Sequence, residues 1–278
     1  MKKGSFEIEL VGKIGSMALI RKEDNDIDYN IFSRLGAELR PGTVWVSSGA
    51  TEIGRLDYIK RAGKELTGEM DAVKTDYAAQ GQAILMQNYR QFINASYSVR
   101  QVLVEHRHFN EPEKRNHIKH LLLRCAEQGA IPIINYNDAV NAEENRRMEL
   151  SELREHSDGH VVECIDNDET AAEIAVLMHA RILLIMTSAY GIYKDPKDPS
   201  TLIEEIRGRD AAEVVRNIRE MQRYCVGSSR EGANGAKAKL EYIIEPVKQG
   251  TTVIIGHAQH RISELLEGKV KRTIIGIS

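Results

Sequence analysis

The sequence has little that would point to a metal centre, secretion, a membrane or nucleic acid. Its three cysteines, Cys125, Cys164 and Cys225, are odd in number and lack the spacing of a zinc site or a disulfide framework. No apolar run approaches the roughly 20 residues that cross a bilayer, and no signal-peptide core follows the N-terminal lysines. A formal net charge of -3 gives no basic footprint for nucleic acid. We therefore expect a cytoplasmic protein with no nucleic-acid or membrane partner.

Two common nucleotide-binding signatures are also absent. The chain has no Walker A spacing, and no Gly-x-Gly-x-x-Gly follows its first apolar run, which counts against a standard dinucleotide site. It has no low-complexity linker and no internal repeat. With 278 residues and 42% hydrophobic content it can bury a sizeable core. The simplest interpretation is a single domain, 1–278, with two lobes that divide near residues 165 and 166.

Short apolar runs alternate with longer amphipathic segments along the whole chain. Several runs are apolar throughout, which is typical of strands covered on both faces. The alternation predicts an α/β fold, a three-layer α/β/α sandwich with a mostly parallel central sheet. The predicted strands are 8–14, 43–46, 102–104, 131–134, 182–186 and 251–255, and the predicted helices are 29–39, 71–94, 113–127, 169–180, 211–224 and 236–249.

Polar residues that follow the apolar runs are candidate site residues, because ligands of open α/β sheets bind beyond the carboxyl ends of the strands. The most informative group is Asp166-Asn167-Asp168, which stands where a strand pattern gives way to a helix. The first turn of a helix presents free N–H groups, and the two aspartates add carboxylates there. This arrangement suits a metal-nucleotide and an anionic acceptor.

Four further clusters each allow a functional and a structural interpretation. Lys13 lies between two glycines that would let the backbone approach an anion, although such pairs are common in turns. The hydroxyls of Ser47-Ser48 could bind a ligand or cap a helix. Asp138 could receive an ammonium group or belong to an Asx-rich turn. Residues 187–196, with Tyr190 and Tyr193, could line a nucleotide pocket or form a surface loop.

A fifth cluster, 232–240, opens a helix and can cradle phosphates, with Lys239 reaching the transferring group. In this order the clusters resemble the amino acid kinase family, and within it the glutamate 5-kinases, from about Glu7 to Ala258. The motifs that carry the resemblance are Lys13-Ile14-Gly15-Ser16, Ser47-Ser48-Gly49-Ala50 with Gly54-Arg55, Ala78-Ala79-Gln80-Gly81-Gln82, Pro132 to Val140, Asp166-Asn167-Asp168 and Gly232 to Lys239.

The resemblance implies a role for each matched residue and a carbamate kinase-like fold. The first lobe would bind the acceptor and the second lobe the nucleotide. The implied catalytic residues are Lys13, Asp168 and Lys239; the acceptor-binding residues are Ser48, Gly49, Asn135, Asp138 and Asn167; the nucleotide-binding residues are Lys13, Gly15, Ser16, Thr187, Ser188, Tyr193, Gly232, Ala233, Asn234, Gly235 and Lys239; and Asp166 would bind or position a metal ion.

The activity that the resemblance implies is phosphorylation of the γ-carboxylate of L-glutamate by ATP and Mg²⁺, giving glutamyl 5-phosphate for proline biosynthesis. It also implies a homo-oligomer. Because the sequence stops soon after the kinase region, we expect no PUA domain. One alternative is a kinase of the same fold that acts on another small acid, a phosphonate or a nucleotide. A second is a non-catalytic nucleotide- or effector-binding protein, against which the retained lysines and Asp168 argue.

The chain departs from the family pattern at several positions. Tyr136 replaces a glutamate beside the acceptor residues, and Ser188 replaces an aspartate near the nucleotide. Asn234 and Ala236 replace a glycine and a methionine. A charged insert, about 141–160, lengthens the link to Asp166. We expect this insert to be a solvated excursion, with a lid or an oligomer contact as the alternatives.

Overall fold

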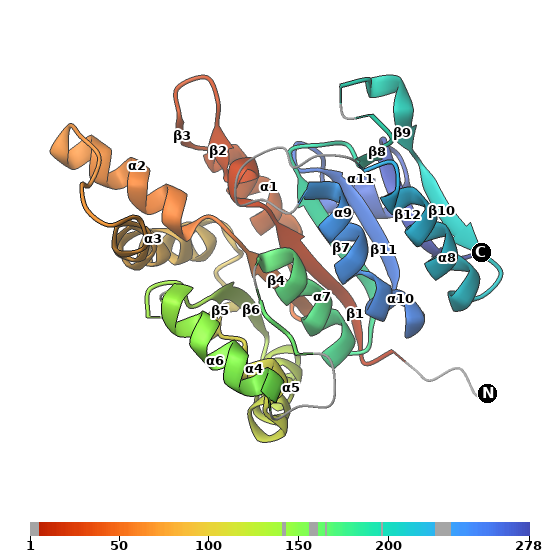
Figure 1. Cartoon of the computed structure of the whole chain (residues 1–278). Helices are drawn as coiled ribbons and strands as arrows, with labels where there is room; N and C mark the ends of the chain where they lie inside the picture. The colour runs from red at the N-terminus through yellow and green to blue at the C-terminus, as the bar shows by residue number, and fades with distance from the viewer. Residues whose placement is uncertain (1–5, 141–142, 156–160, 165, 196, 226–234) are drawn as a thin grey trace. The chain divides into compact units, whose positions relative to one another are not determined.

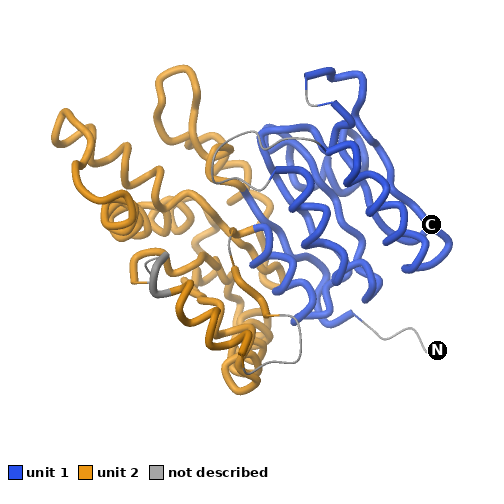
Figure 2. The backbone as a smooth tube through the Cα atoms, viewed as in Figure 1, with its two compact units in different colours: residues 1–14, 168–278 blue, residues 15–167 orange. Residues whose placement is uncertain are grey.

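The structure is a computed structural model that describes residues 6–140, 143–155, 161–164, 166–195, 197–225 and 235–278 (Figure 1). The chain forms two compact units (Figure 2). Unit 1 comprises Met1–Ile14 and Asp168–Ser278, and unit 2 comprises Gly15–Asn167. The expected division near residue 165 lies close to the one at residue 167, while the first strand belongs to unit 1. None of the described helices is long and apolar enough to span a bilayer.

Unit 1 is built on a sheet in the order β10-β12-β11-β7-β1. Strands β1 and β11 pair in parallel with β7, β10 pairs in parallel with β12, and β11 and β12 are antiparallel. All but one residue of β7 from Ala180 to Met186 is buried, as expected of a strand covered on both faces. The bounds are β1 (Ile8–Ile14), β7 (Ala180–Thr187), β8 (Ile192–Tyr193), β9 (Leu202–Ile203), β10 (Glu205–Gly208), β11 (Thr252–His257) and β12 (Arg272–Ile277), with α7 (Asn167–Leu177), α8 (Ala211–Gln222), α9 (Gly235–Tyr242), α10 (Ile244–Lys248), α11 (Ile262–Glu267) and the 3₁₀ turn η2 (Pro199–Thr201).

Unit 2 contains three parallel strands in the order β4-β6-β5. Every residue of β6 is buried, and beside it the Trp45 indole donates to the Tyr89 hydroxyl, which donates to Ser47 Oγ. This buried network fixes the end of β4. The bounds are β4 (Thr43–Ser47), β5 (Ser98–Val104), β6 (Ala130–Tyr136) and the hairpin β2 (Ile20–Arg21) with β3 (Asp26–Ile27), and the helices are α1 (Tyr29–Glu38), α2 (Ala50–Ala62), α3 (Met70–Phe92), α4 (Arg107–Asn110), α5 (Pro112–Glu127), α6 (Glu143–Glu155) and the 3₁₀ turn η1 (Ser16–Leu19).

Helices α2 and α3 approach each other closely where two glycines meet. A Cβ atom at Gly54 would lie 1.9 Å from the carbonyl oxygen of Tyr77, and one at Gly81 would lie 1.8 Å from that of Ala50. Glycine normally weakens a helix interior by about 1 kcal/mol relative to alanine, so its presence here reflects backbone contact. The contact sets where Ala50 and Ala78 stand relative to each other.

The predicted α/β class with mostly parallel strands is confirmed, and each of the six predicted strands is present. The predicted helix 236–249 is wrong in one respect, because it divides at Ile243 into α9 and α10. Pro246 is the third residue of α10, where its missing N–H costs no helical hydrogen bond. The predicted helices do not include α2, α4, α6 or α11, and the predicted strands do not include β2, β3, β8, β9, β10 or β12. The insert is also more than an excursion, since most of it forms α6.

Candidate active site

Unit 1 holds a cluster of two lysines and one aspartate, in which Lys13 and Asp168 are buried and Lys239 is half-buried. Lys13 lies near the carboxyl end of β1, Asp168 in the first turn of α7 and Lys239 on α9. Lys13 Nζ is 2.5 Å from Asp168 Oδ1, and Lys239 Nζ bonds Oδ2 of the same carboxylate. The exposed fractions of Lys13 and Asp168 are 7% and 2%. The structure thus brings all three predicted catalytic side chains together.

The charge balance of this cluster favours an anion. Burial alone would raise the pKa of Asp168, but the ammonium groups of Lys13 and Lys239 outweigh it and lower this pKa to about 2. The carboxylate therefore stays ionised and holds both lysines in place. Two ammonium groups and one carboxylate leave one positive charge. In a buried setting this charge is well suited to stabilise a transferring phosphoryl group.

In unit 2, a chain of side-chain amides joins three of the predicted acceptor residues. Asn167 Nδ2 donates to Ser48 Oγ at 3.1 Å and to Asn135 Oδ1 at 2.9 Å. Asn135 Nδ2 in turn donates to Gln82 Oε1 at 2.9 Å. Among the described residues, no partner reaches Gln82 Nε2 or Asn167 Oδ1, although both atoms are buried. Buried polar atoms are rarely left unpaired, so these two are candidate ligand contacts.

Gly49 stands between Ser48 and α2 in a conformation that few other residues adopt. Its φ of +113° lies in the left-handed region, and its carbonyl accepts the N–H of Ile53 in the first turn of α2. A Cβ atom at this position would lie 2.9 Å from Leu19 Cδ1. The glycine therefore lets the chain turn sharply from β4 into α2, and Ser48 lies at that turn.

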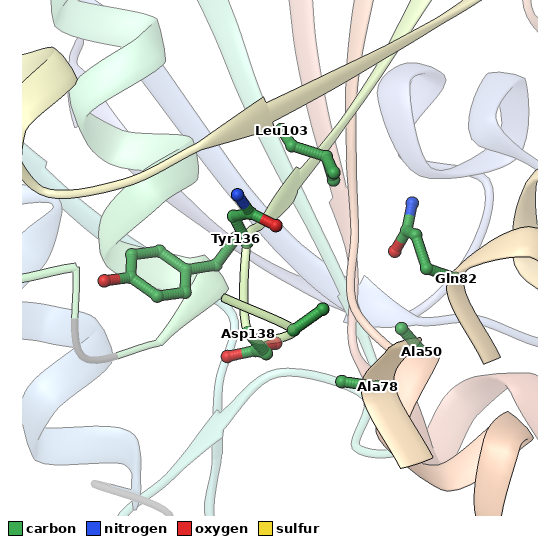
Figure 3. A pocket seen from close by; sticks show the side chains of 8 residues that line it. Ala50, Ala78, Gln82, Leu103, Tyr136 and Asp138 are labelled. Carbon is green, nitrogen blue, oxygen red and sulfur yellow. The ribbon is translucent and has the colours of Figure 1, made fainter. Parts of the chain in front are cut away.

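A small pocket of unit 2, with a cavity volume of about 20 Å³, adjoins these amides. Figure 3 shows Gln82, Ala50 and Ala78 on one side and Tyr136 and Asp138 on the other, with the Tyr136 ring directed away from Gln82. Burial raises the pKa of Asp138 from 3.8 to about 6, and the nearby Arg146 lowers it in part. An ammonium ligand would stabilise the ionised carboxylate. The lining residues are Ala50, Ala78, Gln82, Leu103, Tyr136, Asn137, Asp138 and Ala139.

Tyr136, which departs from the family pattern, is a buried wall of this pocket. Only 4% of the residue is exposed, and its hydroxyl lies 3.4 Å from Nδ1 of the buried His106. Burial raises the pKa of its phenol, so the ring is neutral. The Cζ atom of Arg146, on α6, lies 5.7 Å from the centre of the Tyr136 ring. The sequence interpretation did not include Arg146 or Gln82 among the site residues.

The predicted nucleotide-binding residues are spread over both units. Gly15 caps η1 in an extended conformation, and Ser16 is its first residue, in unit 2. In unit 1, Thr187 ends β7 with its carbonyl accepting from Ala258 N, Ser188 is exposed and Tyr193 lies in the hairpin strand β8. Gly235, with φ of +63°, begins α9. Gly232, Ala233 and Asn234 lie outside the described residues.

An aromatic group lies at the carboxyl ends of β7 and β11. The ring centres of Tyr190 and His257 are 4.9 Å apart, and Gln259 Nε2 donates to the Tyr190 hydroxyl at 2.7 Å. The sequence left open whether the segment with Tyr190 and Tyr193 lines a nucleotide pocket or forms a surface loop, and in the structure Tyr190 has His257 as an aromatic neighbour. His257 was not among the predicted site residues.

Comparison with known proteins decides the family. The sequence pattern described as the amino acid kinase family matches residues 10–257. The chain belongs to the amino acid kinase family. Glutamate 5-kinase of Alkaliphilus metalliredigens is 30% identical over 278 residues, covering 96% of this chain and 94% of that protein. Glutamate 5-kinase of Aquifex aeolicus is also 30% identical, covering 96% of this chain and 68% of that protein.

Solved structures of low sequence identity share the fold of this amino acid kinase. UMP kinase from Ureaplasma parvum superposes with a TM-score of 0.54 at 14% identity, over 97% of this chain and 98% of that one. An isopentenyl phosphate kinase substrate complex gives 0.53 at 14% identity, over 98% and 100% of the two chains. The predicted amino acid kinase fold is therefore confirmed.

Membership of the amino acid kinase family implies ATP and usually Mg²⁺, and the residues present fit a metal ion that arrives with the nucleotide. The described residues hold no group of three or more His, Cys, Asp or Glu side chains that could bind a metal ion alone. Mg²⁺ is commonly held by one or two carboxylates together with substrate phosphates. Both carboxylate oxygens of Asp168 pair with lysines, so Asp166 is the better candidate for a carboxylate that binds Mg²⁺.

Proposed function

We propose that this amino acid kinase transfers the γ-phosphoryl group of ATP to the γ-carboxylate of L-glutamate, giving glutamyl 5-phosphate, the activated acid of proline biosynthesis. The similarity to two glutamate 5-kinases over nearly the whole chain supports the acceptor. The observation that carries the proposal is Asp138, a half-buried carboxylate that lines a small pocket and that an α-ammonium group would neutralise.

For phosphoryl transfer to a carboxylate, the protein mainly has to position the reactants and to stabilise the phosphoryl charge. A γ-carboxylate is already ionised at neutral pH, so attack on phosphorus requires no general base. Lys13 and Lys239 would stabilise the charge that spreads over the phosphoryl oxygens, and Asp168 would keep both lysines aligned. Asn167, Asn135 and Ser48 would orient the acceptor. Mg²⁺, when bound with ATP, neutralises phosphate charge, and Asp166 would help to hold it.

ADP release from MgATP across a panel of acceptors tests the proposal. The panel holds glutamate, aspartate, N-acetylglutamate, UMP and small phosphonates, with hydroxylamine to trap an acyl phosphate. Glutamate-dependent ADP release with a hydroxamate of matching amount is the expected result. Turnover with another acceptor and none with glutamate would contradict the acceptor while keeping the kinase chemistry. Nucleotide binding without turnover of any acceptor would contradict the kinase activity itself.

A further inference from the structure

The charged insert forms a helix that is tied to the rest of unit 2. Glu149 of α6 places Oε1 3.0 Å from Arg107 Nη2 and Oε2 3.0 Å from Nε2 of the buried His106. The neighbouring Leu150 is 5% exposed. A buried leucine and a paired carboxylate give α6 a fixed docking position on α4. The orientation of the side chains on this face of α6 is therefore a property of the fold.

Arg146 lies on the same face of α6, three and four residues before Glu149 and Leu150. Its guanidinium lies over the ring of Tyr136, at a distance typical of a cation–π contact. Tyr136 and Asp138 both line the acceptor pocket, and Arg146 is the charged neighbour that opposes the effect of burial on Asp138. The half-buried carboxylate of Asp138 therefore lies in the pocket wall, and the Arg146 guanidinium, from a different segment, lies over the Tyr136 ring beside it.

We infer that Arg146 binds the α-carboxylate and Asp138 the α-ammonium group of the acceptor, so that the pocket selects an α-amino acid zwitterion. This deepens the proposed function and rests on it. A zwitterion supplies each protein charge with an opposite partner, which offsets the cost of burying Asp138. A guanidinium matches a carboxylate with two parallel hydrogen bonds. Acceptors with an acylated or missing amine leave the Asp138 carboxylate unpaired and are rejected.

Arg146 is thus a specificity-determining residue that sequence motifs do not reveal. Where the family has a glutamate, Tyr136 offers a neutral ring over which the Arg146 guanidinium lies. His106 Nδ1 lies 3.4 Å from the Tyr136 hydroxyl, and His106 Nε2 lies 3.0 Å from Glu149 Oε2. One buried histidine therefore contacts both the ring and the helix that carries Arg146.

The test uses three ligands and four variants of the full-length protein. Glutamate has both α groups, 4-aminobutyrate lacks the α-carboxylate and glutarate lacks the ammonium group. Dissociation constants by calorimetry and KM values are measured for the wild type, Arg146→Gln, Arg146→Lys, Asp138→Asn and the control Arg147→Gln, whose arginine is exposed on the same helix. Thermal unfolding confirms that each variant is folded.

We expect Arg146→Gln to weaken glutamate binding by about 10- to 100-fold, the usual value of hydrogen bonds to charged groups, and to leave 4-aminobutyrate unchanged. Arg146→Lys should recover part of the loss. Asp138→Asn should weaken glutamate and 4-aminobutyrate alike and leave glutarate unchanged. Arg147→Gln should match the wild type with all three ligands.

The inference is overturned if Arg146→Gln weakens glutamate and 4-aminobutyrate equally, or if it changes neither. Failure of the proposed function has a different signature. A wild-type protein that binds glutamate but forms no hydroxamate is not a glutamate 5-kinase, and the ligand series then still decides the roles of Arg146 and Asp138. A wild type that does not bind glutamate at all contradicts both.

Discussion

The Asp168 carboxylate can be both buried and ionised because it pairs with the ammonium groups of Lys13 and Lys239. Lys239→Ala removes one of the two ammonium groups from its carboxylate and from the transferring phosphoryl group. We expect turnover to fall by about 10²- to 10³-fold, the usual effect of losing one transition-state charge contact, with a much smaller change in KM for glutamate. Steady-state kinetics of glutamate-dependent ADP release measure both constants.

The matched control for this variant is Lys237→Ala, because Lys237 lies on α9 two residues away with an exposed side chain. It should retain wild-type turnover. If the Lys237 and Lys239 variants lost turnover equally, the loss would come from weakening α9, and Lys239 would have no specific role in the reaction.

Asp138 illustrates how an acceptor site reduces stability. Its pKa is about 6 in the folded protein against 3.8 ordinarily, so folding disfavours the ionised form. The cost is absent below about pH 4, grows as pH rises and is complete above pH 6, where it reaches about 2 to 3 kcal/mol. Asp138→Asn removes it. We therefore expect the variant to be more stable than the wild type at pH 8, by an amount that shrinks as pH falls towards 4.

Urea unfolding of both proteins at several pH values measures this difference. The wild-type stability should fall, relative to the variant, as pH rises through this range. A stability difference that is independent of pH would show that Asp138 is not buried as an ionisable group. If Asp138→Asn is more stable but no longer binds glutamate, then Asp138 lowers stability in exchange for ligand binding, as functional residues often do.

The contact of α2 with α3 positions one side of the acceptor pocket. Gly81→Ala places a methyl group against the Ala50 carbonyl, so the two helices must separate. We expect a loss of roughly 1 to 3 kcal/mol in the free energy of unfolding, together with weaker glutamate binding, because Ala50, Ala78 and Gln82 all line the pocket. Urea unfolding and calorimetry measure the two effects.

Gly276→Ala is the control, since the added methyl would meet its nearest neighbour at 3.4 Å, an ordinary contact distance. It should leave stability nearly unchanged and glutamate binding as in the wild type. Equal glutamate affinity in the Gly81 variant and the wild type would show that the pocket does not depend on the spacing of α2 and α3.

The elements that could be predicted from the sequence are those with one dominant signal. Strands β6 and β7 are apolar almost throughout, and all of β6 and all but two residues of β7 are buried. Helix α6 gives no such signal, because its sequence is mostly charged and its docking depends on Leu150 and the Glu149 pairs. The break between α9 and α10 follows from Pro246, a local signal that the amphipathic pattern concealed.

The site residues also divide into those that the sequence indicated and those that it did not. Lys13, Asp138 and Asp168 stand at strand ends or in the first turn of a helix, where an α/β sheet places its ligands, and the sequence indicated each of them. Gln82 and Arg146 lie within helices, and only the packing of those helices brings Gln82 to the pocket and Arg146 over the Tyr136 ring. No periodic pattern marks which polar residue of a helix turns inward to a ligand.

The division of the chain falls inside the Asp166-Asn167-Asp168 motif. The Asn167 side chain bonds Ser48 and Asn135 in unit 2, whereas Asp168 pairs with Lys13 and Lys239 in unit 1. Two consecutive residues therefore serve two different sets of partners. If the proposed roles are correct, acceptor binding belongs to unit 2, and most of the charge that handles the phosphoryl group belongs to unit 1.

This division predicts separable binding. Asp138→Ala should abolish glutamate binding and leave the affinity for a non-hydrolysable MgATP analogue within about twofold, because independent sites shift each other's free energy little. Lys239→Ala should weaken the analogue and leave glutamate affinity unchanged. In hydrogen exchange, glutamate should slow α3 and the end of β6, and the nucleotide should slow α9. If glutamate affinity fell with the Lys239 variant, or if each ligand protected both sets of segments, the two sites would be energetically coupled and the assignment of one ligand to each unit would be wrong.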